Sequence, residues 1–275
     1  ERVIEALKNQ GYGRTPFHAA WQVSIHGDRV ASKPSIAYLC GYREMNSVKR
    51  LWDGIWKGVK ERSKMLGLMT EYFFVNPVKA DWSRVGGILN ARGVSGVVLG
   101  AFPRSVESIE LPWEQFACAS VDYLQGLDGA HRSAQNHYDA MQRIFEKLLG
   151  EGHRRLGYVG PADCDLRSMQ WAGTFLERQS WLPKKDCVPV LRCEGEGAEN
   201  GFRSWCRESR PDIIITAMPE VAIWRREMLR AGLATPDLFQ LDLHQGSDPD
   251  LNGMIYPARE IGIAATDLVA DQLRN

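Results

Sequence analysis

Polar and aromatic side chains follow several short apolar runs of the sequence, at the points where those runs end. These side chains are Tyr42, Arg43, Phe102, Asp122, Arg167, Met218 and Asp242. If the apolar runs are parallel β-strands, their carboxyl ends meet at one edge of a sheet, where open α/β folds bind ligands. Hydroxyl, carboxylate, guanidinium and aromatic groups gathered there would hold a small polar molecule by hydrogen bonds and ring contacts.

The sequence offers little for catalysis, metal binding or nucleotide cofactors. The first apolar run is followed by GYREMNS instead of GxGxxG, and GxxxxGK[ST], GxSxG and HExxH do not occur. These motifs supply the usual phosphate, nucleophile and zinc sites. The six histidines are scattered, and the six cysteines show no CxxC or Cys/His metal spacing. We therefore expect a binding protein that is not an enzyme and has neither a cofactor nor a metal.

The apolar runs alternate with amphipathic segments in which apolar residues recur every three or four positions. The alternation predicts strands at 36–40, 70–75, 96–101, 116–121, 156–159, 188–191, 213–217, 239–242 and 254–256. It predicts helices at 51–59, 82–89, 133–149, 169–180, 199–208, 220–231 and 258–273. Such alternation is typical of parallel sheets covered by helices on both faces. Nine or ten strands favour two Rossmann-like lobes over one open sheet.

Composition supports an ordinary globular protein. The 275 residues carry 34 basic and 34 acidic side chains, so an overall charge attraction to nucleic acid is not expected. The sequence contains no run of 18 apolar residues, so we expect no membrane-spanning helix. The six cysteines are expected to be free thiols of a cytoplasmic protein. The chain opens without Met and has the look of a fragment.

Four segments resemble the LacI/GalR family of transcriptional regulators, in the family's order. RVIEALKNQGYGRTP (2–16) is similar to the last helix and exit of the helix-turn-helix headpiece. LLGEGHRRLGYVG (148–160) is similar to the family's helix–turn–strand segment around GHRR. The long stretch 210–243, beginning RPDIIITAMPE, and MIYPAREIG (254–262) resemble later family segments. The resemblance covers nearly the whole chain.

The resemblance implies a fold like the type I periplasmic sugar-binding proteins, with a ligand cleft between two lobes joined by three crossovers. Residues 1–33 would be the end of the headpiece and a hinge or linker. Residues 34–135 with 255–275 would form the N-terminal lobe, and 136–254 the C-terminal lobe. It further implies a homodimer, operator DNA as a partner through the mostly missing headpiece, and a small effector, often a carbohydrate.

Carried over position by position, the effector-binding residues include Asn136 and Gln170 besides the strand-end residues above. Gln170 occupies the place of an arginine that clamps the effector in the family, and Arg167 lies one helical turn earlier. Met218 replaces a polar turn, whereas Asp242 keeps the first acid of the family's FDD motif. Asn136 stands where an aspartate is common. The headpiece remnant contributes Lys8, Asn9 and Arg14 toward DNA.

The sequence thus predicts a regulator whose effector-binding and dimerisation region senses a sugar or derivative and modulates operator binding. Because the base-reading helix is missing, we expect this chain alone to bind DNA poorly. The hinge segment FHAAWQV also lacks the leucine that wedges into the minor groove in the family. A solute-binding receptor of a transport system is the alternative, and a sugar-modifying α/β enzyme is a second one.

Overall fold

The computed structural model describes residues 34–42, 49–76, 79–102, 108–123, 130–162, 166–244, 247 and 251–274. These residues fall into two compact units. The first unit holds the described residues from Pro34 to Ala134 and from Ala258 to Arg274, and the second holds those from Gln135 to Pro257. Gln135 and residues 255–257, which the resemblance assigns to the N-terminal lobe, lie in the second unit.

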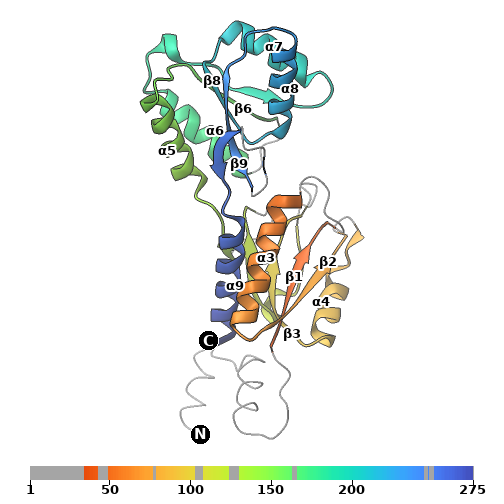
Figure 1. The fold of residues 1–275 in the computed structure, drawn as a ribbon. Coiled ribbons are helices and arrows are strands. Elements are labelled where there is room, and N and C mark those ends of the chain that lie inside the picture. Colours follow the sequence, from red (N-terminus) through yellow and green to blue (C-terminus); the bar gives the residue numbers. More distant parts are fainter. Residues whose placement is uncertain are drawn as a thin grey trace, which may run out of the picture. The chain divides into compact units, whose positions relative to one another are not determined.

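The first unit contains a five-stranded parallel sheet with the order β2-β1-β3-β4-β5 (Figure 1). Its strands are β1 (Ser35–Cys40), β2 (Met69–Phe74), β3 (Val94–Leu99), β4 (Ala117–Val121) and β5 (His131–Ser133). Its helices are α3 (Lys49–Met65), α4 (Trp82–Ala91) and α9 (Ala258–Arg274), with a short 3-10 turn at Trp113–Gln115. β1 and β3 are buried along almost their whole length because helices cover both of their faces.

The second unit repeats this architecture with the strand order β10-β9-β8-β6-β7. Its strands are β6 (Leu156–Pro161), β7 (Leu191–Cys193), β8 (Ile213–Thr216), β9 (Asp237–Leu243) and β10 (Asn252–Ile255). Its helices are α5 (His137–Gly150), α6 (Leu166–Gln179), α7 (Ala198–Ser209) and α8 (Pro219–Arg230), with a 3-10 turn at Lys184–Asp186. The predicted α/β fold of two Rossmann-like lobes with parallel sheets is therefore confirmed.

Two elements begin several residues later than the sequence predicts. The helix predicted from residue 133 begins at His137, because His131–Ser133 pairs with β4 as an unpredicted strand. The Asn136 side chain accepts a hydrogen bond from the Asp139 N–H (3.1 Å) and caps the first turn. The strand predicted at 188–191 is instead β7, Leu191–Cys193, and Val188 is a buried residue before it.

Glycines let two helices of the first unit touch backbone to backbone. A Cβ atom on Gly58 of α3 would lie 2.0 Å from the Arg259 carbonyl oxygen, and one on Gly262 of α9 would lie 2.1 Å from that of Ile55. The Gln272 side chain then fixes α9 to β4, accepting from the Cys118 N–H (3.0 Å) and donating to its carbonyl (2.8 Å). The C-terminal helix is thus an integral layer of the first unit.

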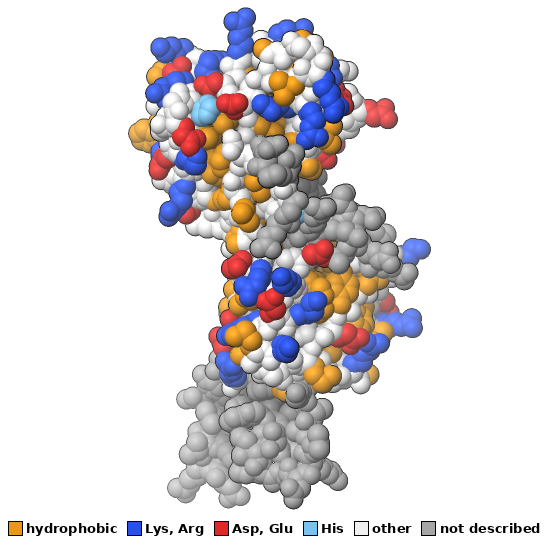
Figure 2. Space-filling model, in the orientation of Figure 1, with side chains coloured by type: hydrophobic (Ala, Val, Ile, Leu, Met, Phe, Trp, Pro, Cys, Tyr) orange, Lys and Arg blue, Asp and Glu red, His pale blue; other side chains and the backbone are white. Residues whose placement is uncertain are grey.

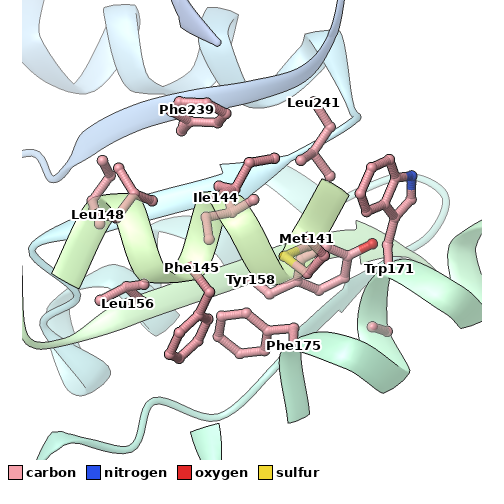
Figure 3. Close-up of a cluster of buried hydrophobic side chains, with 13 residues drawn as sticks. Met141, Ile144, Phe145, Leu148, Leu156, Tyr158, Trp171, Phe175, Phe239 and Leu241 are labelled. Atoms are coloured by element: carbon pink, nitrogen blue, oxygen red, sulfur yellow. The ribbon is translucent and has the colours of Figure 1, made fainter. Parts of the chain in front are cut away.

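Alternate residues of the second sheet serve two hydrophobic cores. Tyr158, Ile215 and Phe239 face α5 and α6, where they pack with Phe145 and Phe175 (Figure 3). The intervening residues, such as Val159 and Ile214, face α7 and α8. Successive strand residues face opposite sides of the sheet, and here both sides are buried. The strands are therefore uninterrupted apolar runs in the sequence.

The GHRR and PD segments meet at the amino edge of the second sheet. The Asp212 carboxylate accepts hydrogen bonds from the backbone N–H groups of Arg154 (2.7 Å) and Arg155 (3.0 Å). The Arg155 guanidinium donates to the carbonyl oxygens of Ser209, Arg210 and Lys185, which ties the end of α7 to the turn at 184–186. These residues hold the fold together, away from the carboxyl edge.

We expect Asp212→Ala to destabilise the second unit by about 2 kcal/mol, since two N–H groups lose a charged acceptor. Urea denaturation of the purified chain measures the change. Glu208→Ala, on an exposed position of nearby α7, is the matched control and should change stability by less than about 0.5 kcal/mol. Equal stabilities for the two variants would show that the Asp212 contacts contribute nothing.

Three of the described cysteines, Cys40, Cys193 and Cys206, are buried. The five described ones, Cys40, Cys118, Cys187, Cys193 and Cys206, are free thiols. Burial raises the pKa of the Cys206 thiol to about 12 and also raises those of Cys118 and Cys193. These three thiols stay protonated at neutral pH. None of the described helices combines the length and apolar character needed to cross a membrane.

Candidate functional site

Each sheet reverses its strand order at one point. In the first unit the chain passes from β1 outward to β2 and then back to β3 on the other side, and in the second unit β6 lies between β7 and β8. At such a switch point neighbouring loops leave in opposite directions and open a crevice at the carboxyl ends of the strands. Tyr42 and Phe102 follow β1 and β3, and Met218 follows β8.

The carboxyl half of β1 carries an aromatic cluster of Tyr38, Trp56 and Tyr72. Their ring centroids lie 5.2 to 5.7 Å apart. The Tyr72 hydroxyl donates to the Tyr42 carbonyl oxygen (2.8 Å) and so fixes the backbone where β1 ends. Burial, and after it the neighbouring Cys40, raise the pKa of Tyr38 and of Tyr72 well above the usual value. Both phenols therefore remain neutral.

Asp122 ends β4 in an unusual backbone conformation. Its φ is 56°, in the left-handed region, and the residue is buried, with an exposed fraction of only 7%. The Asp122 N–H donates to the Ser133 carbonyl oxygen (2.9 Å), which keeps the residue beside β5. Strained non-glycine residues of this kind concentrate at ligand sites, and aspartate tolerates the conformation better than most residues.

The second unit places the remaining described candidates at the same edge of its own sheet. Asp242 is half-buried near the end of β9. Met218 precedes α8, and its N–H donates to the Thr216 Oγ1 (3.0 Å). Gln170 is half-buried in α6, where its carbonyl accepts from the Thr174 hydroxyl (2.8 Å). The Asp242 side chain of β9 and the Gln170 side chain of α6 thus bring polar groups to the second unit's candidate site.

Two predicted site residues have structural contacts. Phe102 is 9% exposed and packs against Trp82 (6.2 Å between centroids) in the first unit's core. Asn136 is the helix cap of α5 described above. Arg43, Lys8, Asn9 and Arg14 lie outside the described residues, as does the side chain of Arg167.

The sequence interpretation missed a buried pair at the amino-terminal turns of α5 and α6. The rings of His137 and Trp171 lie 4.5 Å apart, and both side chains are almost fully buried. Within the part of the chain that the structure describes, the Trp171 indole N–H has no hydrogen-bond partner, and it points away from the other labelled side chains (Figure 3). An indole N–H usually finds a partner when buried, so the lack of one among the described residues makes this donor a candidate for the site. A tryptophan directly after Gln170 was the available signal.

A serine closes the turn that follows β9. The Ser247 hydroxyl lies 2.6 Å from His244 Nδ1 and also accepts from the His244 N–H (3.0 Å), so it closes the turn after β9. Among the described residues no three His, Cys, Asp or Glu side chains are grouped to hold a metal ion. Positive and negative side chains are interspersed over the described part of the face drawn in Figure 2.

No protein-family model matches the sequence, and no curated protein matches it either. Solved structures do. A LacI-family transcriptional regulator, CCPA from Weissella paramesenteroides with bound sucrose, superposes with a TM-score of 0.64 at 17% identity, over 86% of this chain and 91% of that one. A LacI-family regulator from Enterococcus faecium with bound ribose superposes with a TM-score of 0.61 at 16% identity, over 87% of this chain and 90% of that one.

A LacI transcriptional regulator from Lactobacillus brevis gives a TM-score of 0.64 at 14% identity, over 88% of this chain and 94% of that one. This chain has the fold of these LacI-family structures. The resemblance seen in the sequence is therefore confirmed at the level of the fold.

Proposed function

We propose that this chain is the effector-binding region of a LacI-type transcriptional regulator that senses a sugar or sugar derivative in the cytoplasm. The strand-order reversal in both sheets, with polar groups at the carboxyl ends, carries the proposal. Solved relatives in fold hold sucrose and ribose, which favours a carbohydrate as the effector class. Asp122, Asp242, Gln170 and the Trp171 indole N–H supply acceptors and donors suited to sugar hydroxyls.

Regulation follows from linkage between two sites. An effector that binds one arrangement of the protein better than another shifts the population toward it. If operator DNA also prefers one arrangement, the effector changes operator affinity by the same factor by which DNA changes effector affinity. Two copies of the chain would present two headpieces to the half-sites of an operator. In this scheme the candidates for contacts with DNA phosphates are Lys8, Asn9 and Arg14. The further candidates for contacts with the effector are Tyr42, Arg43, Arg167 and Met218.

A thermal-shift and calorimetric screen against ribose, glucose, sucrose, sugar acids and purines tests the proposal. A bound effector raises the melting temperature by mass action. We expect Asp242→Ala to weaken effector binding about 10- to 100-fold, since a hydrogen bond to a carboxylate contributes about 1.5–3 kcal/mol.

Asp237→Ala is the control because Asp237 lies at the opposite end of the same strand, β9, with its side chain 67% exposed. That variant should bind the effector like the wild type. The proposal fails if no compound in the panel binds. If the Asp242→Ala variant binds a compound of the panel as tightly as the wild type does, Asp242 does not belong to the site.

A further inference from the structure

The outer face of α6 is apolar, although nothing in the described structure covers it. Met169 is 53% exposed and Leu176 is 50% exposed, and two helical turns separate them along one line. Gly173 and Ser180 are exposed on the same line. Among the described residues of α6, Glu177 is the one exposed charged side chain. A helix face turned to water ordinarily carries several charged residues.

A tryptophan extends this face just beyond the end of α6. Trp181 is 79% exposed, and its indole N–H donates to the Glu177 carboxylate (2.9 Å). The bond holds the ring beside the Leu176–Ser180 end of the line and engages the single acidic group. Tryptophan is among the residues that contribute most to protein–protein contacts.

Gly173 has no role that the fold of one chain explains. A Cβ atom there would meet no other atom within 4 Å, and its backbone is helical with no positive φ. Alanine would favour the helix by about 1 kcal/mol. The missing side chain leaves a shallow hole between Met169 and Leu176, two large flexible side chains.

The order large, small, large, small along this line is complementary to itself. An antiparallel second α6, related by a two-fold axis between Gly173 and Leu176, would place each Leu176 on the other copy's Gly173. The same axis pairs Met169 with Ser180. A two-fold contact requires such reciprocal pairing. We propose that the outer face of α6 is a contact surface for a second copy of this chain, with Leu176 of each copy seated at Gly173 of the other.

The contact is small. The line from Met169 to Ser180 is about 16 Å long at 1.5 Å per residue. A stable interface buries about 800 Å² on each partner, more than one helix face of this length supplies. The α6 contact therefore assembles copies reversibly, as a concentration-dependent step. It depends on neither the effector nor DNA, so it stands apart from the proposed function.

Sedimentation velocity of the full chain over a range of concentrations tests the contact. We expect Gly173→Leu to weaken the association step at least about ten-fold because the new side chain fills the hole. Leu176→Glu should weaken it similarly. If the face were only a nonspecific apolar patch, Gly173→Leu would strengthen the association, since an added leucine enlarges the patch. The melting temperature of Gly173→Leu should not fall, because leucine is a better helix former than glycine.

Gly201→Leu is the matched control. Gly201 is also an exposed glycine inside a helix, α7, and a Cβ atom added there would meet no other atom within 4 Å. The same substitution there should leave the association constant unchanged. The proposal is overturned if the wild-type chain shows no association step, if neither α6 variant shifts that step, or if Gly173→Leu strengthens it.

Discussion

Gly262→Ala is expected to unfold the first unit under conditions in which the second unit remains folded. The added Cβ atom would lie 2.1 Å from the Ile55 carbonyl oxygen and 3.0 Å from the Val59 nitrogen, both backbone atoms of α3. Neither atom can move unless the whole helix moves. We expect a loss of about 3 kcal/mol or more, at the upper end of overpacking costs.

Hydrogen exchange measured peptide by peptide separates the two units. Protection should fall in β1 and β3 and stay unchanged in β6 and β8. Gly87→Ala is the control because Gly87 is exposed in α4 with open space around it, and that change should stabilise the unit by up to about 1 kcal/mol. If Gly262→Ala costs no more protection than Gly87→Ala, the close helix contact is absent.

Gly157→Ala should have the complementary effect on the second unit. A Cβ atom on Gly157, the second residue of β6, would lie 2.5 Å from the Trp205 ring and 3.1 Å from the Pro211 side chain. The ring cannot turn aside without losing the hydrogen bond from its indole N–H to the Pro189 carbonyl oxygen (2.8 Å). We expect a destabilisation of about 2–3 kcal/mol.

A double-mutant cycle with Trp205→Leu identifies the cause. If the ring is the obstacle, Gly157→Ala should cost at least about 1 kcal/mol less in the Trp205→Leu background than in the wild type. Urea denaturation of the four proteins measures the cycle, and exchange should show lost protection in β6 and β8 alone. Strict additivity would mean that Pro211 or the strand itself opposes the alanine.

The sequence predicted the central strands well because burial on both faces leaves an unmistakable apolar run. Ile213, Ile214 and Ile215 are all buried, whichever side of the sheet they face. β5 could not be predicted in this way. It consists of His131, Arg132 and Ser133, and its strand character comes from pairing with β4, a contact between segments that composition does not reveal.

The sequence could predict that the candidate site lies at the carboxyl edges of the sheets, but it could not predict the side-chain contacts there. Asp122 and Asp242 lie where their strands end, so the topology alone brings each to a carboxyl edge. The packing of Phe102 on Trp82 and of His137 on Trp171 depends on helices remote in sequence. Such contacts become visible only when α4 and α6 have been placed on their sheets.

The return of α9 to the first unit has a consequence for biosynthesis. On the ribosome the whole of Gln135–Pro257 emerges before α9 does. Until then the Gly54 and Gly58 face of α3 has nothing to pack against, and the backbone of Cys118 lacks its Gln272 partner. We expect the later unit to complete its fold first, reversing the usual N-terminal-first order. A chain stalled just short of α9 would then hold one finished unit and one exposed unit that a protease or chaperone can recognise.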